Sequence, residues 1–204
     1  MADRAAAGAL NSGGSNNMYS WKKYFVVQSD YQHWANEVLF SSLDHLQPDV
    51  IGSAQGLFFN SVHHTADHML VVSQLWLARL QGTNLSVNFK SINNPDWREL
   101  KLALRRETRK LQAWLEAQPP EFFDMQVDFV DSEGKARSMW VRDVLTHLNT
   151  HYAHHRGQIS TVATRLGAPC PEMDFVYYRR EMERLLSEMK QAAAPEVTAP
   201  EEEA

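Results

Sequence analysis

The chain has 204 residues, 44% of them hydrophobic, which is enough for one domain with a substantial apolar core. Its formal net charge of -5 at pH 7 provides no basic face for a phosphate backbone, so we expect no nucleic-acid partner. No run approaches the roughly twenty apolar residues that a membrane span requires, so we expect no membrane partner either. A lone cysteine, Cys170, and the lack of a secretion signal predict a cytoplasmic protein.

Hydrophobic periodicity predicts helices over most of the chain. Residues 1–17, rich in Ala, Gly, Ser and Asn, are predicted to form a disordered leader. The first helix follows a helical period from Tyr24 to Ser42 and is stopped before Pro48. A second helix is predicted over residues 53–81, because Gly82 suits the left-handed C-cap.

A third helix is predicted to begin with Asn94 as its N-cap and Pro95 in its first turn, and to end near Gln118. Between Phe122 and Met139 apolar residues alternate with polar ones around a turn at residues 131–134, which predicts a small β-hairpin.

A long helix over residues 138–166 and a shorter one over residues 171–191 follow the hairpin in the prediction. Residues 192–204, rich in Ala, Pro and Glu, are predicted to be a disordered acidic tail. The predicted folded domain is therefore residues 18–191.

Two histidines on the long helix have the spacing of metal ligands. His151 and His155 lie four residues apart, about one helical turn, so their side chains project from one face and can converge on one ion. Two ligands rarely make a site, and ordinary partly buried histidines are the alternative. The best third ligand is His68, whose helix face continues through the apolar residues Val72 and Leu75.

Three neutral imidazoles can bind zinc, copper, iron or nickel and leave a position open for water or substrate. Closed structural sites are usually rich in cysteine, and this chain has no CxxC pair. We therefore expect an open, reactive site with a divalent metal, zinc or nickel.

Other residues near the three histidines leave alternatives open. His64 lies one turn before His68 and is the alternative fourth ligand, although it would occupy the position that a catalytic water needs. His147 is expected to support the ligands or to pack between helices, while His63 and His154 are rotated away from the site. Asp67 is either an acid or base near the metal or a solvated neighbour of a ligand.

Gly157 lies inside the long helix, where glycine costs about 1 kcal/mol relative to alanine. It indicates either a close approach of another group or a merely tolerated glycine. Trp34, Trp76 and Tyr152 line a pocket or, as is more usual for aromatic residues of bundles, belong to the core.

These motifs resemble the DinB family of proposed metalloenzymes, and the likeness spans residues 18–183. The stretch from Phe58 to Ser61 leading to His68, followed by residues 75–80, resembles that family's second helix. His147, His151 and the run HHRGQ at residues 154–158 resemble its signature helix, the most specific part of the likeness. Its first helix and the turn after the signature helix have counterparts in Tyr31, Trp34, Ala35, Asn36, Gly167, Pro169, Pro171 and Asp174.

The resemblance implies an all-α four-helix bundle with an up-down-down-up course, to which this chain adds the short β-hairpin and the C-terminal helix. It also implies a homodimer and a divalent metal bound by His68, His151 and His155. The chain has Asp67 and Thr150 where many relatives have Asn. Neither change removes a ligand, but both alter the hydrogen bonding available near the site.

Two functions fit these features. In the first, the chain is a metal-dependent enzyme that catalyses hydrolysis or thiol transfer, because a metal lowers the pKa of bound water and activates a substrate thiol. The resemblance adds low-molecular-weight thiols as substrates of some members. In the second, the chain is a non-catalytic metal-binding, stress-response protein with a sealed four-ligand site. If His68 were remote from the other two histidines, the bundle would serve only for association.

Overall fold

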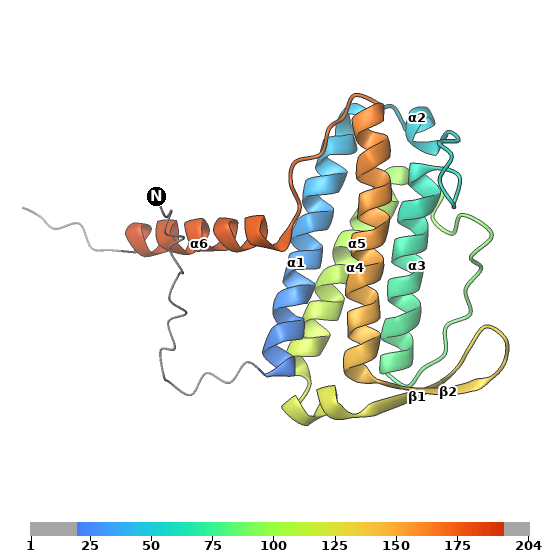
Figure 1. The fold of residues 1–204 in the computed structure, drawn as a ribbon, viewed down its shortest axis with the longest axis vertical. Coiled ribbons are helices and arrows are strands. Elements are labelled where there is room, and N and C mark those ends of the chain that lie inside the picture. Colours follow the sequence, from blue (N-terminus) through green and yellow to red (C-terminus); the bar gives the residue numbers. More distant parts are fainter. Residues whose placement is uncertain (1–19, 194–204) are drawn as a thin grey trace, which may run out of the picture.

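The computed structural model describes residues 20–193. The predicted leader, residues 1–17, and all but two residues of the predicted tail lie outside this range. Four long helices form a bundle (Figure 1): α1 (Trp21–Ser42), α3 (Val62–Leu80), α4 (Trp97–Ala117) and α5 (Val141–Arg165). None of the helices in the described range combines the length and apolar character needed to span a bilayer.

The helices follow the predicted up-down-down-up course. α1 and α5 run in one direction and α3 and α4 in the other, and α1 and α3 each lie beside both α4 and α5 (Figure 1). Since α3 and α4 are parallel, the connection between them must return along the length of the bundle. Residues 81–96 make this crossover on the outside of α3 (Figure 1).

Smaller elements close the two ends of the bundle. At one end are a 3₁₀ turn (Leu43–His45) and a short helix, α2 (Pro48–Gly52). At the other end a 3₁₀ turn (Pro120–Asp124) leads into the predicted antiparallel hairpin of β1 (Gln126–Val130) and β2 (Ala136–Trp140). A sixth helix, α6 (Phe175–Ala192), extends away from the bundle (Figure 1).

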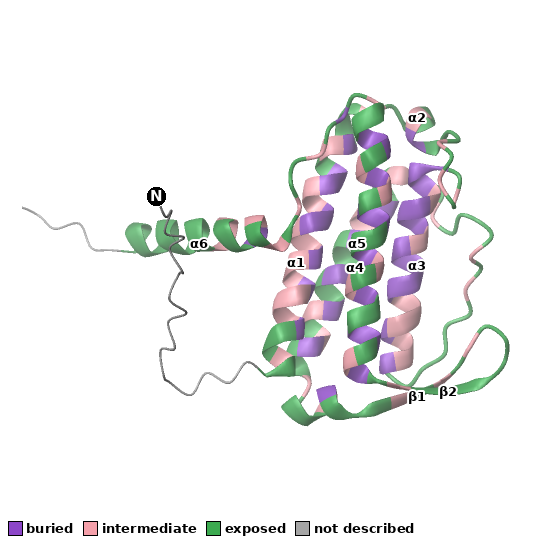
Figure 2. Ribbon diagram, in the orientation of Figure 1, coloured by how far each residue is buried: buried purple, intermediate pink, exposed green. Residues whose placement is uncertain are grey.

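The core lies between the four long helices, whose inward faces are buried along their length (Figure 2). It consists of two apolar clusters, one toward α2 around Leu39, Leu70 and Ile159, and one toward the hairpin around Phe25 and Phe123. Six of the buried polar side chains lie at mid-height in the bundle, and those on α1 and α4 fall between the two apolar clusters. We call these six residues the polar layer: Gln32, Asn36, Ser73, Glu107, Thr108 and Arg156.

Four predicted helix starts were wrong. α6 begins at Phe175 rather than at residue 171, and the other three differences have a cause in local hydrogen bonding. α3 begins at Val62 rather than residue 53, since the Ser61 hydroxyl accepts the His64 N–H at 3.1 Å and Asn60 has a φ of 68°. The N-cap of α4 is Asp96, which accepts the Glu99 N–H at 2.8 Å, and not Asn94. α5 begins at Val141 because residues 138–140 still pair within the hairpin.

Candidate metal centre

The three predicted ligands come together between α3 and α5. His68 lies on α3, and His151 and His155 lie one turn apart on α5. The Nε2 atom of His151 is 3.1 Å from that of His68 and 3.2 Å from that of His155. One ligand nitrogen from each residue lies within 4.8 Å of the others, and no other group of this kind occurs in residues 20–193.

These distances suit a common metal ion. A tetrahedral zinc ion binds imidazole nitrogen at about 2.0–2.1 Å, which sets two such nitrogens about 3.3 Å apart. The observed separations of 3.1 and 3.2 Å are close to that value. The chemistry of the three donors therefore fits a divalent ion of the kind expected from the sequence.

Neighbouring groups orient the three rings. The side-chain oxygen of Gln158 lies 2.8 Å from Nδ1 of His155, and if it accepts that N–H it leaves the lone pair of His155 on Nε2. The ring of His68 stacks on Phe59, with centroids 4.0 Å apart, and meets Phe89 at 5.6 Å. Sequence reasoning did not identify Gln158, Phe59 or Phe89 as parts of the centre.

The protein environment favours neutral rings. Burial, together with the neighbouring imidazoles, lowers the pKa of His68 to about 4 and that of His151 to about 3. Burial also lowers the pKa of His155. At neutral pH these rings therefore keep the lone pairs that a metal ion requires.

Asp67 is buried, so the alternative of a solvated neighbour of a ligand is wrong. Its side chain is 1% exposed, and its two oxygens accept four hydrogen bonds of 2.7–3.1 Å from the backbone and side-chain amides of Asn93 and Asn94. A carboxylate with all these partners is not solvated. Asp67 fixes the crossover against α3, next to His68.

The remaining histidines lie around the centre without joining it. His64 packs against Phe59 at 5.5 Å and is not part of the ligand group, so the four-histidine alternative is wrong for this structure. Nε2 of His63 lies 2.7 Å from the Asn94 carbonyl oxygen, and His154 is exposed, as expected. His147 packs against Trp76 at 5.4 Å and against His151 at 5.6 Å.

A comparison with models of known protein families matches residues 18–191 to the DinB family. The chain belongs to the DinB family. None of the curated proteins matches this DinB chain.

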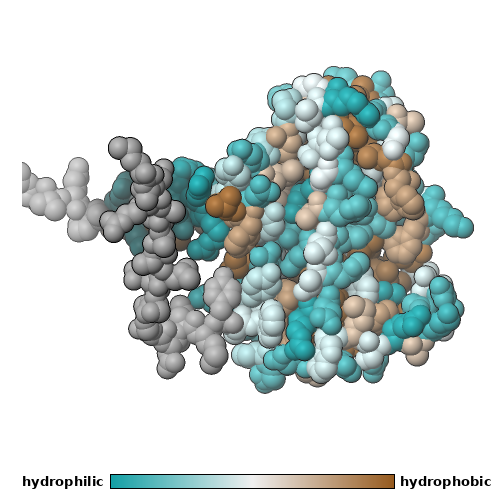
Figure 3. All heavy atoms as spheres, viewed as in Figure 1, coloured by the Kyte–Doolittle hydropathy of each residue, from teal (hydrophilic) through white to brown (hydrophobic). Residues whose placement is uncertain are grey.

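A cavity of about 760 Å³ opens beside the histidines of this DinB protein. Side chains of α3, the crossover, the hairpin and α5 line it, including Trp76, Phe89, Phe129, His147 and His151. Hydrophobic surface gathers on the α3 side of the bundle, in keeping with these linings (Figure 3). Of the three aromatic residues considered from the sequence, only Trp76 reaches this cavity, since Tyr152 is buried in the core and Trp34 packs against Tyr178.

Gly157 provides space rather than a close contact. A β-carbon built at this position meets nothing within 4 Å, so the predicted close approach is wrong and the glycine is merely tolerated.

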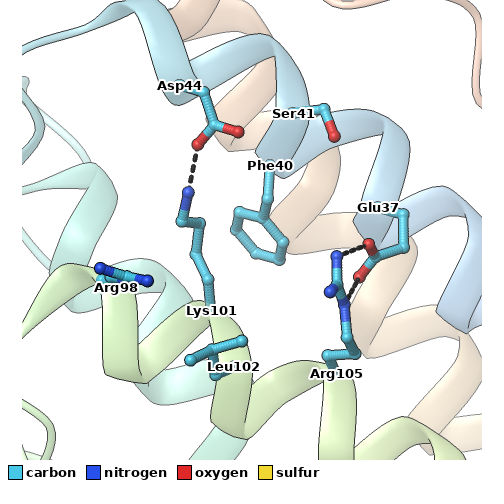
Figure 4. A pocket seen from close by; sticks show the side chains of 8 residues that line it. All are labelled: Glu37, Phe40, Ser41, Asp44, Arg98, Lys101, Leu102 and Arg105. Atoms are coloured by element: carbon cyan, nitrogen blue, oxygen red, sulfur yellow. Dashed lines mark hydrogen bonds and ion pairs between the residues drawn. The ribbon is translucent and has the colours of Figure 1, made fainter.

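A second hollow lies on the surface between α1 and α4, and two of its three basic side chains pair with carboxylates (Figure 4). Arg105 pairs with Glu37 and Lys101 pairs with Asp44, on either side of the Phe40 ring (Figure 4).

Proposed function

We propose that this DinB-family protein binds a divalent metal ion, zinc or nickel, through His68, His151 and His155, and that it is a metal-dependent enzyme acting on a small molecule. The convergence of three Nε2 atoms at 3.1 and 3.2 Å is the observation that carries the proposal. The neutral state of the rings and the contact of Gln158 with His155 support it.

The residues around the centre have distinct parts in this proposal. A divalent ion held there would supply Lewis acidity, which lowers the pKa of a water molecule or a substrate thiol. Gln158 orients His155, while Phe59 and Phe89 cover the ring of His68 and exclude water from it. Asp67 holds the crossover in place beside His68, because its oxygens accept hydrogen bonds from Asn93 and Asn94.

Hydrolysis and thiol transfer with a low-molecular-weight thiol are the two reactions that we propose for the site. We favour an enzyme over a non-catalytic metal-binding, stress-response protein for two reasons. His64 is turned toward Phe59, which leaves three ligands rather than four, and a cavity large enough for a small molecule reaches His151. A homodimer and a cytoplasmic location belong to the same proposal.

Elemental mass spectrometry on tag-free protein, purified without added metal and then incubated with zinc or nickel, tests the metal site. We expect near-stoichiometric metal in the parent and at least about a tenfold loss of affinity in His68→Ala, His151→Ala and His155→Ala. His154→Ala is the matched control and should keep the metal, because His154 is exposed beside a ligand without being one. An empty parent, or ligand variants that retain metal, would refute the site.

A further inference from the structure

The cavity beside the histidines contains a positive charge at a distance from them. His151 belongs to its lining, and so does Arg79 at the hairpin end of α3. Arg79 follows His68 by eleven residues on one helix, which corresponds to about 16 Å along the helix axis. Arg79 and the histidine centre therefore lie at different heights along the bundle.

The guanidinium of Arg79 is held in place by aromatic rings. It lies 4.6 Å from the centre of the Trp76 ring and 4.4 Å from that of Phe129. Its Nη2 donates to the carbonyl oxygen of Val130 at 3.2 Å. These contacts fix the plane of the guanidinium and leave most of its five N–H groups for another partner.

No carboxylate forms an ion pair with Arg79 within residues 20–193. Burial lowers the pKa of Arg79, and the charge of the nearby Asp131 opposes this shift only in part. The nearby Asp131 is already committed, since it pairs with Arg137 at 2.7 Å and accepts the backbone N–H groups of Glu133 and Lys135 at 2.9 Å. Arg79 is thus the charge in the cavity for which a ligand would supply the partner.

The walls between Arg79 and His151 are mainly apolar. Trp76, Phe129, Phe89 and Val72 contribute to them, and the volume of about 760 Å³ falls in the range typical of small-molecule sites. An apolar or flat group fits such walls, whereas a second charge in the middle of the ligand would lose its hydration without a partner there.

We propose that the cavity binds an elongated molecule with a carboxylate group at one end. The carboxylate group pairs with Arg79, the apolar body lies along Trp76 and Phe129, and the far end reaches the histidine centre. Only the identity of that far end, a metal-binding group such as a thiol, rests on the proposed function. A planar guanidinium gives a carboxylate two parallel hydrogen bonds, which an alcohol of the same length cannot form.

Titration calorimetry with matched probes tests this assignment. The probes are mercaptopropanoate, mercaptooctanoate and mercaptoundecanoate, each compared with the mercaptoalcohol of equal chain length on zinc-loaded protein. We expect the longer carboxylates to bind about tenfold more tightly than their alcohols, because a hydrogen bond to a charged group contributes more than a neutral one. The shortest pair should show no such preference, because it cannot span the cavity.

Variants locate the carboxylate. Arg79→Gln should abolish the preference for the carboxylate over the alcohol, and Arg79→Lys should restore part of it. Arg142→Gln is the control and should retain the preference, because Arg142 lies next to the hairpin and pairs with Asp124 but does not line the cavity. The preference is the ratio of the two probe affinities measured within one variant. A general loosening of the hairpin would weaken the binding of both probes and leave this ratio unchanged.

The same titrations on metal-free protein, with octanoate and octanol as thiol-free probes, separate this proposal from the metal site. A preference for octanoate over octanol that depends on Arg79 would support the assignment, even if zinc did not increase the affinity of the thiol probes. If thiols bind more tightly with zinc but Arg79→Gln keeps the carboxylate preference, the assignment of Arg79 is wrong and the metal site stands.

Discussion

Glu107 is a buried carboxyl group whose loss of hydration is only partly offset by neighbouring groups. Its side chain lies in the polar layer with 5% exposure, and its Oε1 atom has no hydrogen-bond partner within residues 20–193. Burial raises its pKa above the ordinary value of 4.5, and Lys110 opposes this shift only in part. The folded protein therefore binds this proton at a higher pH than the unfolded chain does, and the contribution of Glu107 to stability decreases as the pH rises through the folded pKa.

We expect Glu107→Gln to raise the free energy of unfolding by about 1 kcal/mol at neutral pH, because the amide needs no proton to remain neutral. The gain should shrink as the pH falls toward 4.5, where the native carboxyl group is also protonated. Urea unfolding at several pH values measures this. Glu116→Gln, an exposed position on the same helix, is the control, and an equal gain at every pH would contradict the argument.

Single residues also show what could be predicted about the site. The spacing of His151 and His155 on one helix, and the position of His68 on an apolar helix face, predicted the cluster because helical periodicity alone determines those directions. The role of Asp67 could not be predicted, because its partners Asn93 and Asn94 lie in an irregular segment 26 and 27 residues later. No periodic pattern connects such residues.

At the scale of elements, α5 contains one position, Gly157, at which a substitution can raise the stability of the protein. We expect Gly157→Ala to stabilise the protein by about 0.5–1 kcal/mol, because alanine loses less backbone entropy in a helix and a β-carbon there meets nothing within 4 Å. Thermal and urea unfolding measure the change. Gly167→Ala is the opposing control and should destabilise, because Gly167 ends the helix with a φ of 82°. A loss of stability in Gly157→Ala would show that this glycine has a structural role.

The elements themselves were easier to predict than their ends. The four long helices and the hairpin follow from runs of apolar residues spaced at the helical or strand period. The starts of α3 and α4 depend instead on the hydrogen bonds of Ser61 and Asp96. Several polar residues near each start are equally good caps by type, so residue type alone does not select among them.

At the scale of the whole molecule, α6 presents a surface that the bundle does not cover. Tyr178 packs inward, but beyond it the helix is exposed (Figure 2), with Leu186 57% and Met189 68% exposed. Together with Met182 and Leu185 these two residues follow a helical spacing and form one apolar stripe. A second copy of the chain, the partner in the proposed homodimer, would remove this stripe from water.

We therefore expect sedimentation equilibrium to give the mass of two chains for the parent and of one chain for the double variant Leu186→Asp with Met189→Asp. Burying each such side chain contributes about 1.5–3 kcal/mol, and a charge on the stripe removes this gain. The double variant Ser187→Asp with Gln191→Asp adds the same two charges off the stripe and should leave the dimer intact. A parent that stays monomeric at every concentration would refute this arrangement.

The crossover of residues 81–96 has a consequence for how the family can diversify. It packs outside the four long helices, yet it brings Phe89 to His68 and lines the cavity, and Asp67 fixes it through Asn93 and Asn94. We therefore expect substitutions and length changes between Gly82 and Asn93 to alter the cavity more than the four long helices, although Phe89 also packs against the apolar cluster near the hairpin. In evolutionary terms, the lining of the cavity in this architecture can drift or be selected while the three histidines and the helical scaffold stay constant.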